Sequence, residues 1–207
     1  MHDKNKTTLR TPRLMLRRWE ISDAEDLFTW ASDKDVGPAA GWPQHKSVQE
    51  SRNIIETVFV GSECYALCPN QNAEGLFDKE PFKNICANTI IGCIELKLNG
   101  FTNLTNRNDE CEMGFWIAKP FWGYGLIPEA AQELLRHAFD DLGMRTVWCG
   151  YYDGNEKSKR AQEKIGFVFH HTNKETPVPL LQETRTEHIN YMTYEVWREI
   201  HKTETMY

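Results

Sequence analysis

The hydrophobic residues of this chain recur with helical spacing in some stretches and with strand spacing in others. Two early helices are predicted, one from Ser22 with Glu25 in capping-box position and one from Ser47 with Glu50 in the same relation. The glycines and prolines of residues 36–45 predict a loop between them. The expected apolar stripes of the two helices are Ala24, Leu27, Phe28 and Ala31 in the first, and Ile54, Ile55, Val58 and Phe59 in the second.

Strand-like segments account for much of the remaining hydrophobic sequence. The first follows Pro12. Three more, at residues 63–68, 89–98 and 110–118, are separated by polar, turn-rich stretches, which favours an antiparallel meander. The insert at residues 70–84 is long for a hairpin loop, and we expect a flexible surface excursion there, with a lid as the alternative.

The second half of the chain predicts helices that alternate with strands. An amphipathic helix is expected over about residues 124 to 140, with Gly143 as its stop and with Glu129 and His137 on its polar face. A strand, a helix closed by a glycine and two further strands are expected to complete the domain, at residues 146–152, 155–166, 167–171 and 189–195.

The order of these elements predicts a single α+β domain over residues 1–207. Its core is a mostly antiparallel, twisted central sheet flanked by helices. One crossover helix joins the strands at 110–118 and 146–152, so we expect these two strands to be parallel.

The composition narrows the class of protein. The chain has 207 residues, of which 40% are hydrophobic and 26% charged, as in an ordinary folded domain. The net charge of −6 and the scattered basic residues argue against nucleic-acid binding. No apolar stretch approaches the roughly 20 residues of a membrane span, and the N-terminus lacks the apolar segment of a signal peptide. We therefore expect a cytoplasmic protein.

The cysteines and histidines show no spacing typical of a metal site. The six cysteines are expected to be reduced and buried, as in a cytoplasmic protein. His170 and His171 are neighbours on a predicted strand and would point to opposite faces, so we do not expect them to act together. We predict neither a metal ion nor a covalent acyl-cysteine.

The segment KPFWGYG, residues 119–125, places two glycines directly before the predicted helix. Backbone N–H groups from Trp122 to Leu126 would lie at the positive end of that helix, unobstructed at Gly123 and Gly125, an arrangement that binds phosphates. A glycine before a helix also serves simply to turn the chain, and both interpretations stay open here. The segment lacks the lysine of a P-loop and the third glycine of a dinucleotide-binding loop, which argues against those two classes.

Four segments together resemble the GNAT superfamily of acetyl-CoA-dependent N-acetyltransferases, and most closely its ribosomal-protein-alanine (RimJ/RimL-like) branch. They are TPRLMLRRW, IIGCIEL, ECEMGFWIAKPFWGYGLIPEA and NEKSKRAQEKIGF, and the resemblance covers about residues 8 to 198. The pairing of W-G-x-G with N-x-x-S-x(6)-I-G-F is more specific than either motif alone. One departure is Pro120, at a position where the superfamily usually has Gln or Arg.

The resemblance implies acetyl-CoA as cosubstrate, held in a gap where the strands ending near Ile117 and Tyr152 splay apart. It implies that Asn155 contacts the pantetheine arm in addition to capping its helix. Trp116 and Trp122 would pack beside the cofactor or simply support the sheet. The complete set of residues expected at the cofactor is Phe115, Trp116, Ile117, Trp122, Gly123, Tyr124, Gly125, Leu126, Asn155 and Ser158.

The expected chemistry is direct transfer in a ternary complex. Glu112 shares a strand face with Gly114 and Trp116, and it is a candidate to deprotonate the acceptor ammonium, directly or through water; an ion-paired strand residue is the alternative. The resemblance implies that Ser158 protonates the departing thiolate, and the alternative is a small packing residue. Strand N–H groups at 115–117 would stabilise the oxyanion.

The acceptor is expected to be a primary amine, either a protein N-terminus or a small molecule. Trp42 is a candidate for the amine pocket through the resemblance, and Tyr191 is a candidate from the last strand, where aromatic residues usually belong to the core. The loops expected to select the acceptor are residues 36–45 and 172–188. A catalytically silent acetyl-CoA-binding module of the same fold is the alternative function, and the oligomeric state, a homodimer included, stays open.

Overall fold

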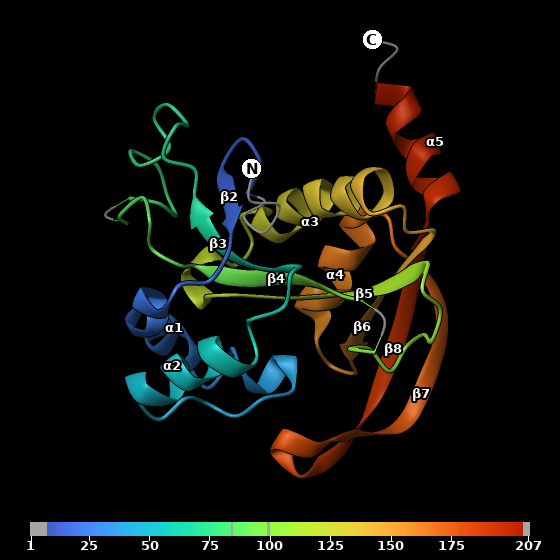
Figure 1. Ribbon diagram of the computed structural model, residues 1–207, viewed down its shortest axis with the longest axis horizontal. Coiled ribbons are helices and arrows are strands. Elements are labelled where there is room, and N and C mark those ends of the chain that lie inside the picture. Colours follow the sequence, from blue (N-terminus) through green and yellow to red (C-terminus); the bar gives the residue numbers. More distant parts are fainter. Residues whose placement is uncertain (1–7, 84, 99, 205–207) are drawn as a thin grey trace, which may run out of the picture.

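The fold is a mixed α/β arrangement around one sheet, seen in a computed structural model that describes residues 8–83, 85–98 and 100–204 (Figure 1). The first seven and last three residues of the predicted domain lie outside these ranges. The sheet has eight strands in the order β1-β2-β3-β4-β5-β6-β8-β7, and only β5 and β6 are parallel to each other within it. The strands are β1 Leu9–Arg10, β2 Leu14–Arg17, β3 Cys64–Pro69, β4 Gly92–Lys97, β5 Glu110–Ile117, β6 Thr146–Tyr152, β7 Val168–Val178 and β8 Glu183–Thr193.

Helices cover both faces of the sheet, which confirms the predicted α+β architecture. One face packs against α3 (Leu126–Arg136) and α4 (Glu156–Ile165), and the other packs against α1 (Ala24–Ala31) and α2 (Val48–Thr57). The alternation along β5 produces this division: Met113 joins the core under α3, whereas Trp116 joins the core under α1 and α2. The sheet thus has two hydrophobic cores, one on each face, and the same strands contribute side chains to both.

The two early helices begin with side-chain caps. Ser47 accepts a hydrogen bond from the Glu50 N–H at 3.1 Å, as predicted. The first capping box is formed by Glu20 and Asp23 instead of Ser22 and Glu25, around a 3-10 turn that precedes α1. Asp23 is buried and forms an ion pair with Arg17, which positions its carboxylate to cap that turn.

The expected stripe of α2 has one wrong member. Ile55 is buried, but Val58 lies beyond the last residue of the helix and is 56% exposed. Val58 is the C-cap of α2, so the apolar spacing continues past the last helical residue, and Phe59, which also follows the helix, packs against the core under α1 and α2.

The C-terminal region differs most from the prediction. Residues 172–188, expected as a loop, belong to the long antiparallel hairpin of β7 and β8, and α5 (Tyr194–Glu204) follows where a strand end was expected. Most side chains of β7 are exposed, so this hairpin lacks the apolar alternation by which a strand is recognised. Backbone pairing to β8 maintains its extended shape.

His170 and His171 also contradict the prediction that they lie on opposite faces. Their Nδ1 atoms are 2.7 Å apart. The pairing of β7 with β8 shifts register between Phe169 and His171, and such a bulge breaks the alternation of side chains. The two rings therefore lie side by side.

In the described part of the insert, residues 70–83, a few side chains are buried against the core and most of the others are exposed or half-buried. Leu76 and Phe82 are 9% and 1% exposed and belong to the core that includes Phe121. All six cysteines are free, and Cys86 alone among them is exposed. No helix in the described part of the chain has the length and apolar character needed to cross a bilayer.

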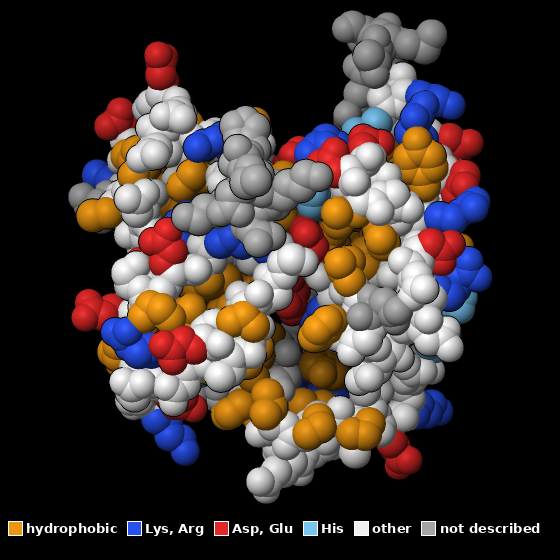
Figure 2. All heavy atoms as spheres, viewed as in Figure 1, with side chains coloured by type: hydrophobic (Ala, Val, Ile, Leu, Met, Phe, Trp, Pro, Cys, Tyr) orange, Lys and Arg blue, Asp and Glu red, His pale blue; other side chains and the backbone are white. Residues whose placement is uncertain are grey.

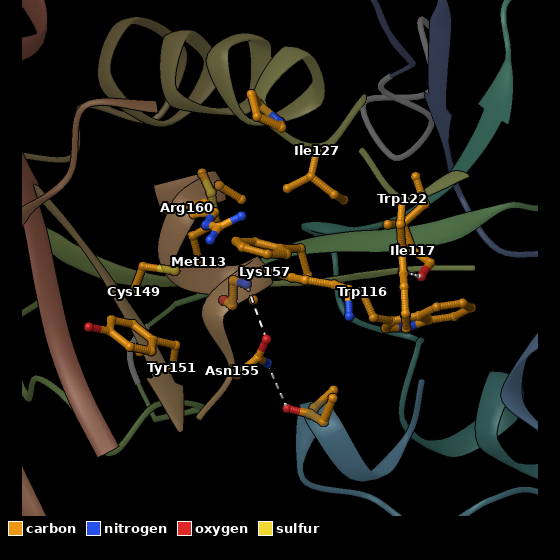
Figure 3. A pocket seen from close by; sticks show the side chains of 18 of the residues that line it. Met113, Trp116, Ile117, Trp122, Ile127, Cys149, Tyr151, Asn155, Lys157 and Arg160 are labelled. Atoms are coloured by element: carbon orange, nitrogen blue, oxygen red, sulfur yellow. Dashed lines mark hydrogen bonds between the residues drawn. The ribbon is translucent and has the colours of Figure 1, made fainter. Parts of the chain in front are cut away.

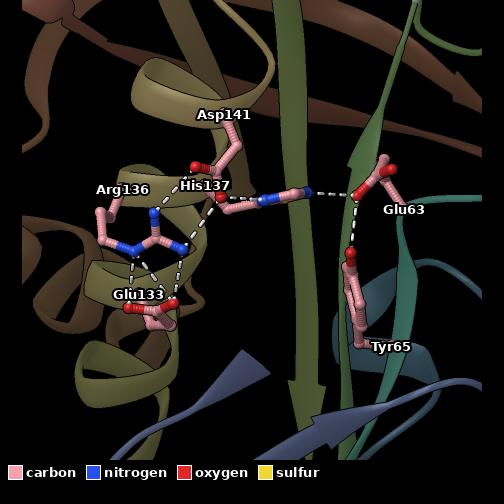
Figure 4. Close-up of polar contacts among 6 residues, drawn as sticks. All are labelled: Glu63, Tyr65, Glu133, Arg136, His137 and Asp141. Atoms are coloured by element: carbon pink, nitrogen blue, oxygen red, sulfur yellow. Dashed lines mark hydrogen bonds and ion pairs between the residues drawn. The ribbon is translucent and has the colours of Figure 1, made fainter. Parts of the chain in front are cut away.

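His137 is buried, contrary to the prediction that it lies on a polar face. It begins the π-helical segment His137–Asp141 that continues α3. Its Nε2 is 2.9 Å from Glu63 Oε2 and its Nδ1 is 2.8 Å from Asp141 Oδ2 (Figure 4). The hydrogen bond with Glu63 raises the pKa of His137 despite the opposing effect of burial. The carboxylate and the imidazolium therefore stabilise each other between β3 and the end of α3.

Replacing His137 with glutamine is expected to lower the free energy of unfolding by about 2 kcal/mol near pH 6, because Glu63 loses a charged partner. The pKa of His137 is higher in the folded state than the ordinary 6.5, so its contribution is complete below about pH 6.5 and is lost as the pH rises through the folded-state pKa. Guanidinium unfolding at pH 6 and pH 9 measures this, with exposed His171→Gln as control. An equal loss at both pH values would contradict the ion-pair assignment.

Candidate active site

A cavity opens where β5 and β6 separate. The two strands pair from Glu110 with Thr146 to Glu112 with Trp148, and they diverge beyond that point although both continue. The cavity there has a volume of about 690 Å³ and reaches from the α3–α4 side of the sheet to the side of the α1–α2 loop. Figure 2 shows a hollow bordered by hydrophobic side chains on one face of the molecule. In Figure 3, Met113, Cys149 and Tyr151 lie on one side of the cavity, and Trp116, Ile117 and Trp122 lie on the other.

The glycine turn lies at the N-terminus of α3, at one end of this cavity. Gly123 and Gly125 line the cavity and have φ angles of 83° and 72°, in the left-handed region that favours glycine. Gly125 is the N-cap of α3, so the first N–H groups of the helix have no intrahelical acceptor. This geometry combines unpaired donors, a positive helix end and an absence of side chains, as an anion site requires.

Residues from the N-terminal hairpin hold this turn from outside. Arg13 donates from Nη1 to the Tyr124 carbonyl at 3.0 Å and forms an ion pair with Glu129 at 2.6 Å. Glu129 also accepts a hydrogen bond from the Thr11 hydroxyl at 2.5 Å. Glu129 is therefore a partly buried anchor of the first turn of α3, and not the water-facing residue that the periodicity predicts.

Three cations from α4 line the same end of the cavity. They are Lys157, Arg160 and Lys164, and the Lys157 ammonium lies 4.2 Å from the centre of the Trp122 ring. Sequence reasoning missed them, although their spacing of three and four residues on a helix that starts at Asn155 was a usable signal. Positive side chains beside a backbone anion site suit a ligand with several phosphates.

Asn155 and Ser158 occupy the start of α4, as predicted. Asn155 Oδ1 accepts from the Ser158 N–H and Asn155 Nδ2 donates to the Ala39 carbonyl, both at 3.1 Å. The Ser158 hydroxyl lines the cavity and accepts from Gln162 Nε2 at 3.2 Å. No described residue accepts the Ser158 hydroxyl proton, so this proton is available to a group in the cavity.

Charged groups also line the opposite end of the cavity, on the α1–α2 side of the sheet. Glu112 forms an ion pair with Lys97 at 2.7 Å and accepts from the Thr102 hydroxyl at 2.5 Å. Glu95 lies 4.0 Å from the Lys97 ammonium. Burial would lower the pKa of Lys97, but the two carboxylates outweigh burial and raise it. Both oxygens of Glu112 are thus engaged by neighbours, as the ion-paired alternative to its role as a base expects.

A further carboxylate, Glu187 on β8, lines this end of the cavity beside Tyr152. Burial raises the pKa of Glu187, and the charge of Glu112 adds to the effect. The sequence contained no signal for Glu187, because the segment 172–188 has no readable pattern and was expected to be a loop.

The structure brings most of the predicted cofactor residues to the cavity and leaves three predicted residues off its lining. Phe115, Trp116, Ile117, Trp122, Gly123, Gly125, Leu126, Asn155 and Ser158 line it. Tyr124 is 42% exposed and Trp42 packs edge-on against Trp116. Tyr191 packs against Trp148 and His170, at ring distances of 5.7 and 5.4 Å, and those two rings also contact each other at 5.1 Å.

The chain belongs to the acetyltransferase (GNAT) domain family, whose sequence model matches residues 13–168. A relative from Bacillus subtilis (strain 168), named "Putative ribosomal N-acetyltransferase YdaF", is 42% identical over 66 residues, which are 32% of this chain and 36% of that protein. The matched part is therefore about one third of that relative.

Solved structures with the same fold include two acetyltransferases. A GNAT-family acetyltransferase from Bacillus anthracis superposes with a TM-score of 0.71 at 19% identity, over 91% of this chain and 99% of that one. The microcin C7 self-immunity acetyltransferase MccE, in complex with acetyl-CoA and AMP, has a TM-score of 0.65 at 16% identity, over 87% of this chain and 92% of its own. At these identities the likeness establishes the fold.

Proposed function

We propose that this protein transfers the acetyl group of acetyl-CoA to a primary amine by direct attack in a ternary complex. The observation that carries the proposal is the continuous cavity through the β5–β6 gap, with Lys157, Arg160 and Lys164 at one end and the carboxylates of Glu112 and Glu187, with Lys97 beside Glu112, at the other. A polyanionic donor and a cationic acceptor would enter from opposite sides and meet in the gap. Family membership supports acetyl-CoA as the donor.

The residues at the basic end fit coenzyme A. The turn around Gly123 and Gly125 would accept the pyrophosphate on backbone N–H groups, with Lys157, Arg160 and Lys164 as counter-charges. The edge of β5 beyond Glu112 is not paired with β6, so its backbone groups can hydrogen-bond the amides of the pantetheine arm, except the Ile117 carbonyl, which accepts from Trp122 Nε1 at 2.8 Å. When bound there, coenzyme A supplies the thioester that the amine attacks.

Positioning is the main contribution of the gap to catalysis. It brings the two reactants together in a buried space, which converts a bimolecular step into an effectively unimolecular one. N–H groups of β5 at 115–117 that point into the gap would stabilise the negative charge that develops on the thioester oxygen. Ser158 would donate its available proton to the sulfur as the carbon–sulfur bond breaks.

The proposed acceptor is a protein N-terminus or a small-molecule amine. The RimJ/RimL-like motifs support a peptide α-amine, and the carboxylates Glu112 and Glu187 support a cationic group of either kind. The test is release of coenzyme A from acetyl-CoA, followed by thiol colorimetry, with peptides that begin with Ala or Ser, polyamines, amino acids and aminoglycosides. Release above the enzyme-free rate with one class identifies the acceptor. Binding of acetyl-CoA without release for any class would instead indicate a silent binding module.

Ser158→Ala is expected to lower kcat about tenfold and to leave the dissociation constant of coenzyme A unchanged. The loss is modest because a thiol with a pKa near 8.5 is a good leaving group without help. Steady-state kinetics and isothermal titration calorimetry measure the two quantities, with the exposed Ser22→Ala as control. Weakened coenzyme binding would mean that Ser158 serves in binding and not in proton transfer.

A further inference from the structure

The acceptor end of the cavity is lined by two carboxylates, Glu112 and Glu187, and the steps above assign neither of them a proton transfer. Glu187 lines the cavity from β8, where it pairs in register with Tyr152. In the described part of the chain Glu187 has no ion-pair partner, and its hydrogen-bonding neighbour is the hydroxyl of Thr176 on β7. Glu187 is therefore a partly buried carboxylate that can still accept a proton.

The other two carboxylates nearby are already engaged. Glu112 is bound to Lys97 and Thr102, so accepting a proton would break an ion pair and a hydrogen bond. Glu95 also faces Lys97 and is absent from the cavity lining. Of the three, only Glu187 combines access to the cavity with freedom from a cation.

Two glycines, one on each strand that borders the gap, leave room for a neighbouring carboxylate to lie against the strand. A Cβ added to Gly150 on β6 would lie 2.6 Å from Glu187 Oε1, and one added to Gly114 on β5 would lie 3.0 Å from Glu95 Oε1. Gly114 and Gly150 both line the cavity, just beyond the last pair of the parallel ladder. The absence of a side chain at Gly150 thus lets the Glu187 carboxylate lie against the strand that borders the gap, next to the proposed site of attack.

We infer that Glu187 is the base that removes a proton from the acceptor ammonium, an inference that rests on the proposed acetyl transfer. The Glu187 carboxylate takes one N–H proton and passes it to solvent, and the neutral amine then attacks the thioester carbonyl. The carbon–nitrogen bond forms, and the carbon–sulfur bond breaks with its electron pair going to sulfur. The nitrogen loses its second proton to Glu187, which is a carboxylate again after passing the first proton to solvent, and the amide forms. Ser158 gives its hydroxyl proton to the thiolate, which leaves as a thiol, and the serine regains a proton from solvent.

The charged surroundings suit this role. Glu112 on β5, Lys97 on β4 and Tyr152 on β6 face Glu187, and Arg185 stacks on the Tyr152 ring at 5.0 Å. Burial and the charge of Glu112 favour the protonated form of Glu187, which raises its pKa, while Lys97 opposes them. A carboxyl with a raised pKa is a stronger base than an ordinary one, so it removes the ammonium proton more readily.

The test is Glu187→Gln, with the exposed Glu199→Gln on α5 as matched control. We expect kcat/KM for the best amine of the panel to fall about 100-fold at pH 7 for E187Q and to be unchanged for E199Q. The loss should shrink as the pH approaches the pKa of the acceptor itself, near 8 for a peptide α-amine and near 10.4 for an alkylamine, because a neutral amine needs no base. A structural defect would lower the rate equally at every pH.

A second variant keeps the inference falsifiable where E187Q does not fold. Gly150→Ala retains the carboxylate and displaces it from the gap, so we expect the same loss at pH 7 and the same recovery at high pH. Unaltered coenzyme binding, measured by calorimetry, is the folding control for both variants. Wild-type activity with a wild-type pH profile in E187Q overturns the role of Glu187 alone. An inactive wild-type enzyme across the whole panel overturns the proposed function and, with it, this inference.

Discussion

Replacing Gly123 with glutamate is expected to abolish measurable coenzyme A binding, raising its dissociation constant about 1,000-fold or more. Two effects add. A side chain at φ 83° strains the backbone by about 1–3 kcal/mol, so the free turn relaxes to another conformation and binding must restore the strained one. A carboxylate beside the pyrophosphate adds a like-charge repulsion of several kcal/mol. Each 1.4 kcal/mol corresponds to a factor of ten in affinity. Isothermal titration calorimetry with coenzyme A measures the result.

The control for Gly123→Glu is Gly143→Glu. Gly143 also has a positive φ, of 69°, has no neighbouring atom within 4 Å of an added Cβ, and lies outside the cavity lining. Gly143→Glu therefore reproduces the backbone strain and the added charge of Gly123→Glu. It differs only in that the new carboxylate lies away from the cavity. Equal affinity in G123E and the wild type would disprove the phosphate site at the glycine turn.

Reversing two charges of α4, in the double variant Arg160→Glu and Lys164→Glu, is expected to weaken coenzyme A binding about 100-fold at low salt. Both side chains line the basic end of the cavity and are exposed, so each reversal removes an attraction and adds a repulsion that salt screens. The difference between variant and wild type should therefore narrow at high ionic strength. Calorimetry at two salt concentrations measures both the loss and its narrowing.

Lys159→Glu is the matched control for this pair, because Lys159 lies on the same helix and not on the cavity lining. Dephospho-coenzyme A lacks the 3′-phosphate, so comparing its affinity with that of coenzyme A shows whether Arg160 and Lys164 bind the 3′-phosphate or the pyrophosphate. If Arg160 and Lys164 bind the 3′-phosphate, the variant loses its preference for the complete coenzyme. Wild-type affinity in the double variant would show that the backbone turn alone holds the phosphates.

Local sequence was sufficient for the features that depend on a few neighbouring residues. The cap at Ser47, the cap at Asn155 and the glycine turn at 123–125 were all predicted and occur in the structure. Each depends on a hydrogen bond or a dihedral angle within one turn of chain, so residue type and spacing are enough to predict it. The parallel pair of strands was predicted for a related reason, since one crossover helix joins them.

The sequence predictions that were wrong concern features that depend on residues far apart in the chain. His137 has helical spacing of the polar face, but Glu63 from β3 provides a partner that makes its burial favourable. The hairpin of β7 and β8 has no apolar alternation, and its pairing with β6 and with itself sets its conformation. The register shift beside His171 follows from that pairing, and no local pattern predicts it.

The candidate site also has one part that local sequence predicts and one part that depends on distant residues. The glycine turn and the cap of α4 at the basic end were predictable, because each is a local structure set by a few neighbouring residues. The acceptor end was not readable. Glu112 is a candidate base from its place on a strand, with an ion-paired strand residue as the alternative, and the structure pairs it with Lys97, a cross-strand neighbour on β4. Glu187 reaches the gap from β8, beside a glycine of β6. The glycine turn thus followed from short-range geometry and the fold class from the order of the elements. The availability of each carboxylate depends instead on which charges the folded sheet brings within a few ångströms.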